Sequence, residues 1–224
     1  MISDKLHLRA LIFTGGDCDT ELLLPHLHGD YLGDDGQIAA DVIVIAADSG
    51  YQTAQRAAII PHIIIGDMDS ISALPDDASG IEIIRANPEK DDTDTMLAVK
   101  TACDRGAVDI LIAGGTGGRC DHTLSNVFLL EHLGNDGIKC ALTDGGNFIR
   151  VLKNGTLTLR KRGYRYFSVV ALEDSVVTVT GCAYPLENAT LVRSYPYAVS
   201  NEILPGSDEA VVTVVHGAAV VIES

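Results

Sequence analysis

The sequence predicts an α/β domain with a mostly parallel sheet at residues 1–145, followed by a small all-β, sandwich-like domain at residues 146–224. Short apolar segments alternate with helical patterns in the first part, an order typical of a mostly parallel sheet. After Gly145 and Gly146 only short alternating segments follow, without a helical pattern. The length of 224 residues, 46% of them hydrophobic, suffices for one large domain or two small ones.

Six segments of the first part have the composition of strands buried on both faces. Each is short, apolar and rich in isoleucine, valine or leucine, as strands covered by helices on both sides are. They are Leu8–Phe13, Val42–Ala46, Ile63–Ile65, Ile81–Ile84, Ile110–Ala113 and Lys139–Leu142. The helical patterns between them are Thr20–Leu27, Tyr51–Ala58, Thr93–Arg105 and His122–His132.

The second part consists of short segments with the alternation of half-buried strands. They are Ile149–Lys153, Thr156–Arg160, Tyr166–Leu172, Val176–Thr180, Thr190–Arg193, Val211–Val215 and Ala218–Ile222. Asn154 and Gly155 separate the first two segments, and Asn-Gly between alternating runs is typical of a two-residue hairpin turn. We therefore expect a β-hairpin at this point.

The overall charge and the chain start narrow the class of protein. The net charge of −15 would repel phosphate backbones, so we expect no nucleic acid partner. ATP remains compatible with such a surface where metal ions and a few local cations screen its phosphates. The chain start lacks the basic and long apolar regions of a signal peptide, and no apolar run approaches the roughly 20 residues of a membrane span. We expect a soluble, cytoplasmic protein.

The cysteine pattern favours free thiols. The five cysteines are scattered, odd in number and without a CxxC pair, so the sequence predicts neither a zinc site nor a disulfide framework. They are Cys18, Cys103, Cys120, Cys140 and Cys182.

Acidic side chains follow predicted strands at three places, where α/β proteins bind ligands. The first place holds Asp48, the second Asp67 and Asp69, and the third Lys90, Asp91, Asp92 and Asp94. Carboxylates two apart on an extended segment point the same way, and carboxylates three apart share a helix face. Oxygen ligands without His or Cys suit Mg²⁺, which bridges carboxylates to phosphates. The clusters therefore predict a magnesium site.

The same aspartates have a simpler interpretation as helix caps. Asp48, Asp91 or Asp92 would then cap a helix N-terminus, and the helix dipole would favour Asp94 in the first turn. Asp67 and Asp69 are not explained in this way, because two like charges at one strand end repel each other unless a cation or solvent relieves them.

A glycine-rich loop, Gly114 to His122, follows a predicted strand and precedes a helix. Its glycines let backbone N–H groups approach an anion at the helix N-terminus, and Arg119 offers a planar cationic fork for phosphate oxygens. The loop is neither a Walker A sequence nor a GxGxxG fingerprint, so a tight connection is the alternative interpretation. His122 alone is more typical of a surface residue than of a catalyst. Beside the carboxylates, Arg119 and Lys90 supply the local cations that ATP binding requires.

Five motifs occur in a specific order along the chain. They are ADSG at Ala47–Gly50, GDMDS at Gly66–Ser70, KDDTD at Lys90–Asp94, GGRCDH at Gly117–His122 and VSNE at Val199–Glu202. In this set and order the chain closely resembles the thiamine pyrophosphokinase family, and the resemblance spans nearly the whole chain.

The resemblance implies Mg²⁺-dependent transfer of a pyrophosphoryl group from ATP to the hydroxyl of thiamine. It also implies an α/β catalytic domain, a sandwich-like thiamine-binding domain and a homodimer, with thiamine in a cleft between the domains and the partner subunit. The implied catalytic and Mg²⁺-binding residues are Asp67, Asp69 and Asp94. The implied ATP-binding residues are Asp48, Lys90, Asp91, Asp92, Gly117, Gly118, Arg119, Asp121, His122 and Asn126. The implied thiamine contacts are Ser200 and Asn201.

One feature departs from this family. Some members stack thiamine on a tryptophan near the last strand, close to Val220 here, and this chain has no tryptophan. We expect Tyr184, Tyr195 or Tyr197 to substitute, or apolar contact to suffice.

In the mechanism that the resemblance implies, the thiamine hydroxyl attacks the β-phosphorus of ATP and AMP leaves. Such chemistry depends on positioning and charge stabilisation, and either Asp69 or Asp94 accepts the hydroxyl proton. The residues alone leave two alternatives open. One is a Mg²⁺-dependent nucleotide phosphohydrolase, which releases phosphate without thiamine. The other is a non-catalytic nucleotide-binding regulator, which has little need for so many convergent carboxylates.

Overall fold

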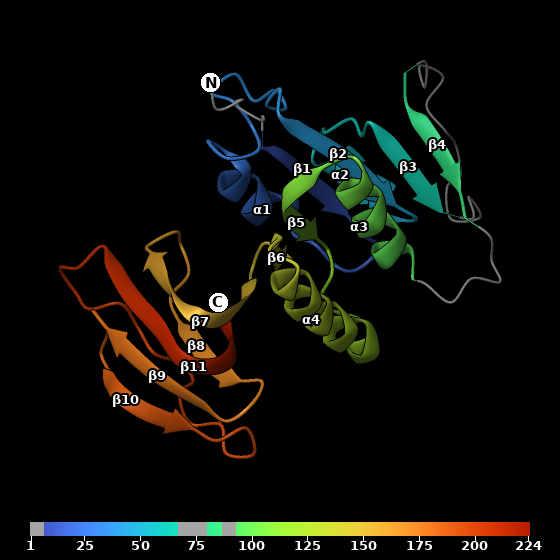
Figure 1. Ribbon diagram of the computed structural model, residues 1–224. Coiled ribbons are helices and arrows are strands. Elements are labelled where there is room, and N and C mark those ends of the chain that lie inside the picture. The colour runs from blue at the N-terminus through green and yellow to red at the C-terminus, as the bar shows by residue number, and fades with distance from the viewer. Residues whose placement is uncertain (1–6, 67–79, 87–92) are drawn as a thin grey trace, which may run out of the picture.

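A mostly parallel sheet forms the first part of the protein, as predicted (Figure 1). The computed structural model describes residues 7–66, 80–86 and 93–224. The parallel strands lie in the order β6-β5-β1-β2-β3-β4. Their bounds are β1 Leu8–Phe13, β2 Val42–Ala47, β3 Ile63–Gly66, β4 Glu82–Arg85, β5 Ala107–Ala113 and β6 Lys139–Thr143. The strand order reverses between β1 and β5, because β2 to β4 extend to one side of β1 and β5 and β6 to the other.

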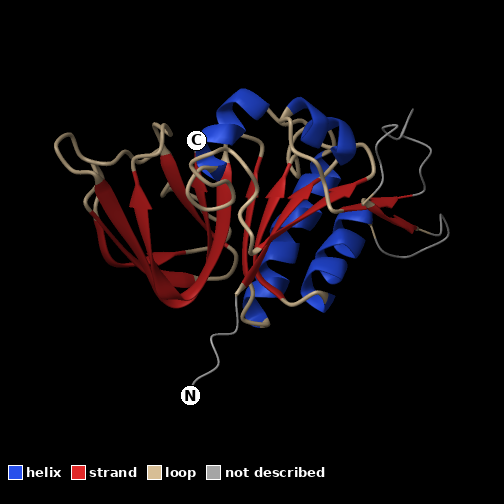
Figure 2. Cartoon of the chain, turned by 90° about the horizontal axis from the view of Figure 1, so that it is seen from above, coloured by secondary structure: helices blue, strands red, loops and turns tan. Residues whose placement is uncertain are grey.

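Helices cover both faces of this sheet (Figure 2). The helices α1 (Thr20–Leu27) and α2 (Gly50–Arg56) pack on the face that carries Leu11 and Phe13. The helices α3 (Asp94–Asp104) and α4 (Cys120–Asn135) pack on the face that carries Ala10 and Ile12. Neighbouring strand residues point to opposite faces, so two covered faces require strands that are apolar throughout.

The edge strand β4 departs from this pattern. We expected it to be buried on both faces like the others, but the Ile83 side chain is 37% exposed. An edge strand has a neighbour on one side only, and its apolar sequence does not reveal this position.

The second part contains strands and no helix in residues 148–223, all of which the structure describes. Its strands are β7 Phe148–Arg160, β8 Phe167–Ala171, β9 Ser175–Thr180, β10 Leu186–Leu191 and β11 Glu209–Glu223. The long strand β11 pairs antiparallel with β7, β8 and β9, and apolar side chains of these strands form a separate core. Because β7 also pairs antiparallel with β6, one continuous hydrogen-bonded sheet runs through both parts of the chain.

The hairpin predicted at Asn154 and Gly155 is wrong. Both residues lie inside the single strand β7, opposite an irregularity of β11 between Val214 and Ala218. Asn154 has a φ of 44°, and its side-chain oxygen accepts the Gly217 backbone N–H at 3.0 Å. The Asn-Gly pair therefore accommodates a bulge that bends two paired strands, and a bulge needs the same left-handed backbone as a turn.

Two further observations complete the fold. All five cysteines are free thiols, as predicted. Within the described ranges, no helix combines the length and the apolar character that crossing a bilayer requires.

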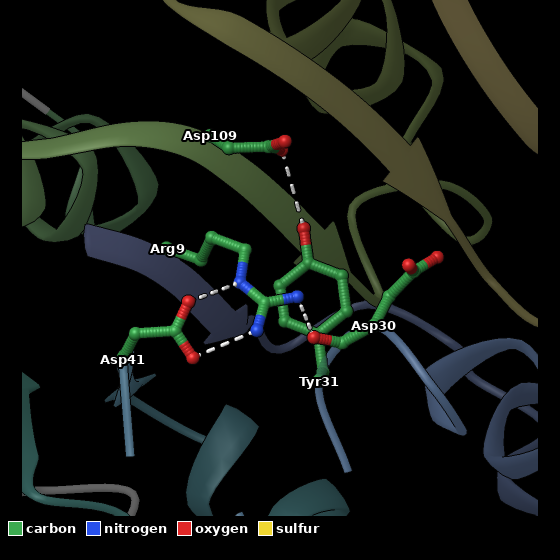
Figure 3. Close-up of polar contacts among 5 residues, drawn as sticks. All are labelled: Arg9, Asp30, Tyr31, Asp41 and Asp109. Carbon is green, nitrogen blue, oxygen red and sulfur yellow. Dashed lines mark hydrogen bonds and ion pairs between the residues drawn. The ribbon is translucent and has the colours of Figure 1, made fainter. Parts of the chain in front are cut away.

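A polar cluster lies at the amino ends of the parallel strands, opposite to their carboxyl ends (Figure 3). Arg9 donates two hydrogen bonds to the Asp41 carboxylate, at 2.9 and 2.8 Å, and a third to the Asp30 carbonyl oxygen. The Tyr31 hydroxyl donates to Asp109 at 3.4 Å. Burial raises the pKa of Asp109, while the hydrogen bond from Arg9 lowers the pKa of Asp41. The two carboxylates therefore make the free energy of unfolding depend on pH with opposite signs.

We expect Asp109→Asn to gain stability relative to the wild type as the pH rises. A carboxyl whose pKa is raised in the folded state contributes stability below its unfolded pKa of about 3.9, and that contribution is lost as the pH rises through the folded pKa. An amide is neutral throughout and still accepts the Tyr31 hydrogen bond. Thermal midpoints of both proteins between pH 4 and pH 8 measure this difference.

Asp41→Asn is the control with the opposite sign. The pKa of Asp41 is lowered, so its contribution is present above the unfolded pKa and lost as the pH falls. This variant should therefore be less stable than the wild type near neutral pH, with a deficit that shrinks in acid. Differences independent of pH for both variants would contradict the assignment.

Candidate active site

A cavity of about 330 Å³ opens at the carboxyl ends of the parallel strands. Its walls come from the loops after β1, β2 and β5 and from the first turns of α3 and α4. The loops after β1 and β5 flank the point where the strand order reverses, which is where open α/β sheets bind ligands. The lining residues are Thr14, Gly15, Gly16, Asp17, Ala47, Asp48, Ser49, Thr93, Asp94, Thr95, Gly114, Gly115, Thr116, Gly117, Gly118, Arg119, His122 and Asn126.

The loops after β1 and β5 touch each other backbone to backbone. A Cβ atom on Gly16 would lie 2.0 Å from the Gly114 carbonyl oxygen and 2.6 Å from that of Thr116. Glycine is therefore required where the floor of the cavity closes. The wall formed by Thr14 to Asp17 is not among the predicted site residues, although its glycine pair follows a buried strand as in the loop after β5.

Two of the predicted carboxylates face this cavity. Asp48 adopts a left-handed backbone with a φ of 51°, and its buried Oδ1 atom has no hydrogen-bond partner among the described residues. Strained conformations and unpaired buried oxygens are typical of sites that bind a ligand or an ion. Asp94 is the first residue of α3 and lines the cavity from the other side of the sheet.

Asp94 lies in the first turn of α3, as the simpler interpretation predicts, but the residues that cap α2 and α3 are not the predicted aspartates. The N-cap of α3 is Thr93, whose hydroxyl oxygen accepts the Met96 backbone N–H at 3.2 Å. The N-cap of α2 is Ser49, and the Asp48 side chain makes no capping hydrogen bond. The Asp48 side chain is thus not accounted for by capping a helix.

Five predicted residues lie outside the described residues: Asp67, Asp69, Lys90, Asp91 and Asp92. In the sequence Asp67 follows Gly66 directly and Asp69 comes two positions later. A Cβ atom on Gly66 would lie 3.3 Å from the Asp48 Cα atom. The chain therefore leaves β3 beside Asp48. Among the described residues, no three His, Cys, Asp or Glu side chains gather closely enough to hold a metal ion by themselves.

The glycine-rich loop has a left-handed backbone just before α4. Gly117 and Gly118 adopt φ values of 81° and 54° before α4 begins at Cys120. Arg119 donates to Asp121 at 2.6 and 3.2 Å, and these bonds raise the pKa of Arg119 and lower the pKa of Asp121. Both side chains are exposed, at 71% and 64%, so solvent screens their pairing.

The remaining predicted residues of this loop divide into two groups. His122 and Asn126 line the cavity. Asp121 does not line it, but it accepts a hydrogen bond from Arg119, which does. The buried Asn126 amide donates to the Gly115 carbonyl oxygen at 2.8 Å and so fixes the loop from α4.

The predicted thiamine contacts lie apart from this cavity, in the antiparallel part. Ser200 is exposed with a φ of 56°. Asn201 is buried, and its side chain accepts the backbone N–H groups of Tyr184 and Glu202 at 3.1 and 2.9 Å and donates to the Tyr184 carbonyl at 2.8 Å. Its amide is thus committed to holding the Tyr184 segment.

A small hollow of about 90 Å³ lies beside Asn201. Tyr184 and Tyr197 line it, whereas Tyr195 is not among its lining residues. Val220 is only 5% exposed and packs in the core that α4 covers. Aromatic side chains near Asn201 are therefore those of Phe167, Tyr184 and Tyr197, and none comes from the position of Val220.

Comparison with known proteins identifies relatives along the whole chain. The model of the catalytic domain of thiamin pyrophosphokinase matches residues 37–142, and that of its vitamin B1 binding domain matches residues 155–218. Thiamine pyrophosphokinase of Bacillus subtilis (strain 168) is 34% identical over 168 residues, and the match covers 71% of this chain and 78% of the relative.

Solved structures give the same result. The crystal structure of thiamine pyrophosphokinase from Bacillus subtilis superposes with a TM-score of 0.80 at 29% identity, covering 96% of this chain and 98% of the other. Thiamin pyrophosphokinase from Geobacillus thermodenitrificans gives a TM-score of 0.77 at 30% identity, with 97% of each chain covered.

Proposed function

This chain belongs to the thiamin pyrophosphokinase family, and we propose that it transfers the pyrophosphoryl group of ATP to the hydroxyl of thiamine. The products are thiamine diphosphate and AMP. One observation carries the proposal: Asp48 and Asp94 line the same cavity as the glycine-rich loop and Arg119. Carboxylates facing backbone N–H groups and a guanidinium suit a nucleotide phosphate chain with its magnesium ion.

We propose Mg²⁺ as the cofactor. The residues present fit a hard cation, because the buried Asp48 oxygen lacks a protein donor among the described residues and Asp94 adds a second carboxylate. Asp67, Asp69 and Asp94 would hold the ion. When bound, Mg²⁺ neutralises negative charge on the phosphates.

The protein residues then act by binding and orientation. The thiamine oxygen forms a bond to the β-phosphorus as the bond to the oxygen of the departing AMP breaks. Backbone N–H groups of Gly117 and Gly118 and the Arg119 guanidinium donate to phosphate oxygens. Asp69 or Asp94 accepts the hydroxyl proton. Fixing both substrates supplies roughly 7–11 kcal/mol of the barrier through effective molarity.

We further propose a division of labour between the two parts of the chain. Residues 1–145 bind Mg²⁺-ATP and residues 146–224 bind thiamine, a division supported by the positions of the two family matches. Ser200 contacts the vitamin, and Tyr184 and Tyr197 supply the aromatic surface that the absent tryptophan would give. The enzyme works as a cytoplasmic homodimer, whose partner subunit helps to enclose thiamine.

Variants of Ser200 and Asn201 separate vitamin binding from folding. Ser200→Ala is expected to raise the KM for thiamine while changing the free energy of unfolding by less than about 0.5 kcal/mol, because the side chain is exposed. Asn201→Ala is expected to lower the free energy of unfolding by about 2–3 kcal/mol, because it removes the three hydrogen bonds of a buried side chain, two of them to the backbone of Tyr184. Urea unfolding and steady-state kinetics measure both effects. An unchanged KM for thiamine in Ser200→Ala would remove that residue from the binding site.

The decisive experiment mixes the protein with ATP, Mg²⁺ and thiamine and separates the products by chromatography. We expect AMP and thiamine diphosphate in equal amounts, and no AMP without thiamine. Asp69→Asn should remain folded and lose orders of magnitude in turnover. Phosphate released without thiamine would indicate a phosphohydrolase, and ATP binding without any turnover would indicate a regulator.

A further inference from the structure

The Asp144 carboxylate helps to hold the turn between β6 and β7. Its Oδ1 atom accepts the Asn147 backbone N–H at 2.6 Å, and the Asn147 side-chain amide donates to its Oδ1 and Oδ2 atoms at 3.2 and 2.9 Å. The Asp144 carbonyl oxygen accepts the backbone N–H of Asp19, just before α1, at 2.9 Å. Asp144 is therefore fixed from two sides.

The same carboxylate contacts a residue in the wall of the active-site cavity. Its Oδ2 atom accepts the hydrogen bond of the Thr116 hydroxyl. Thr116 is only 7% exposed, lies in the middle of the glycine-rich loop and lines the cavity. The neighbouring Gly114 N–H also donates to the Thr143 carbonyl at 2.8 Å, so the end of β6 holds this loop at two points.

We propose that Asp144 is a positioning residue: through Thr116 it holds the glycine-rich loop in the shape that receives the ATP phosphates. The glycines of this loop give it wide conformational freedom, so a fixed shape requires restraints from outside. A carboxylate only accepts hydrogen bonds, so the Thr116 hydroxyl must donate to it and is oriented in one way. This inference rests on the proposed function only in naming ATP as the ligand of the loop.

Asp144→Asn distinguishes positioning from plain electrostatics. Removing a negative charge near a phosphate site should strengthen ATP binding if charge alone mattered. The amide nitrogen that replaces Oδ2 would instead face the donating Asn147 amide, and the network around Thr116 would be disrupted. We therefore expect weaker binding, by about tenfold, the size of one lost hydrogen bond of about 1.4 kcal/mol.

The test is a double-mutant cycle with Thr116→Val, Asp144→Asn and the double variant. Binding of Mg²⁺ with N-methylanthraniloyl-ATP, a fluorescent ATP analogue, is measured directly, beside kcat and the KM values for ATP and thiamine. We expect both single variants to weaken analogue binding and to raise the KM for ATP, with the KM for thiamine within about twofold. The double variant should bind the analogue about as tightly as the single variant with the lower affinity, because both changes break the same interaction.

A rescue variant and a control complete the design. Asp144→Asn combined with Asn147→Asp restores a donor opposite an acceptor and should regain most of the lost affinity. Thr101→Val removes another threonine hydroxyl, which donates to the Leu97 carbonyl within α3 at 2.9 Å, and should leave every constant unchanged.

Three results would overturn the positioning role. They are tighter or unchanged analogue binding by Asp144→Asn, additive effects in the double variant, and lowered thermal midpoints without any change in nucleotide affinity. Failure of the proposed function would look different. The wild type would then bind the analogue and form no thiamine diphosphate, while the cycle would still show coupling between Thr116 and Asp144.

Discussion

Asp94→Asn is expected to lower the turnover number for thiamine diphosphate formation by at least about a hundredfold, the loss typical of removing one preorganised electrostatic group. Asp94 is the first residue of α3 and lines the cavity that also contains Asp48 and the glycine-rich loop. Its carboxylate would hold Mg²⁺ against the phosphates, and a neutral amide is a poor ligand for a hard cation. Initial rates of AMP formation at saturating substrates measure the effect.

The fold of Asp94→Asn should persist, which makes the kinetic result interpretable. The helix cap is Thr93, so the substitution leaves the cap in place, and the dipole interaction of a first-turn carboxylate is worth about 0.3–1 kcal/mol. Glu21→Gln is the matched control, because it removes the same charge from the first turn of α1, away from the cavity. A folded Asp94→Asn variant with the turnover of Glu21→Gln would rule out the proposed role.

Gly50→Ala is expected to lower the free energy of unfolding by at least about 3 kcal/mol, at the upper end for overpacking. A Cβ atom at this position would lie 2.2 Å from the Phe13 carbonyl oxygen and 2.7 Å from the Thr14 nitrogen. These atoms belong to the end of β1, which pairs on both sides in the middle of the sheet and cannot shift cheaply. Urea unfolding curves provide the comparison.

Gly134→Ala provides the counterpart within α4. No atom lies within 4 Å of the added Cβ, and alanine is the better helix former by about 0.8–1 kcal/mol. This variant should therefore be slightly more stable than the wild type. Equal stability of the two alanine variants would show that the approach of α2 to β1 is looser than the structure indicates.

The sequence predicts those elements whose cause is local. The segment Leu8–Phe13 is apolar except for Arg9 because both faces of β1 are covered, and the predicted bounds of that strand are confirmed. The segment Thr20–Leu27 is likewise confirmed, because the preceding Asp19 side chain caps the helix with bonds to its first N–H groups. Such signals lie within a few residues of the element that they define.

Other features depend on residues distant in the chain, and the sequence does not reveal them. Asn154 was interpreted as a turn because its partner Gly217 lies 63 positions away. Asn201 resembles a binding residue, yet its amide is committed to Tyr184 across 17 positions. The role of Asp144 is visible only once Thr116, 28 positions earlier, lies beside it. Spacing along a chain carries no information about such pairs.

The ladder that joins β6 to β7 has a consequence for attempts to divide the protein. A fragment that stops at the turn would leave Ala141, Leu142 and Thr143 of β6 without the strand that pairs with them. Unpaired backbone groups on a newly exposed apolar strand favour association with other chains. Expression of either half alone should therefore yield aggregates, and a soluble fragment would need its new border redesigned with charged or proline residues.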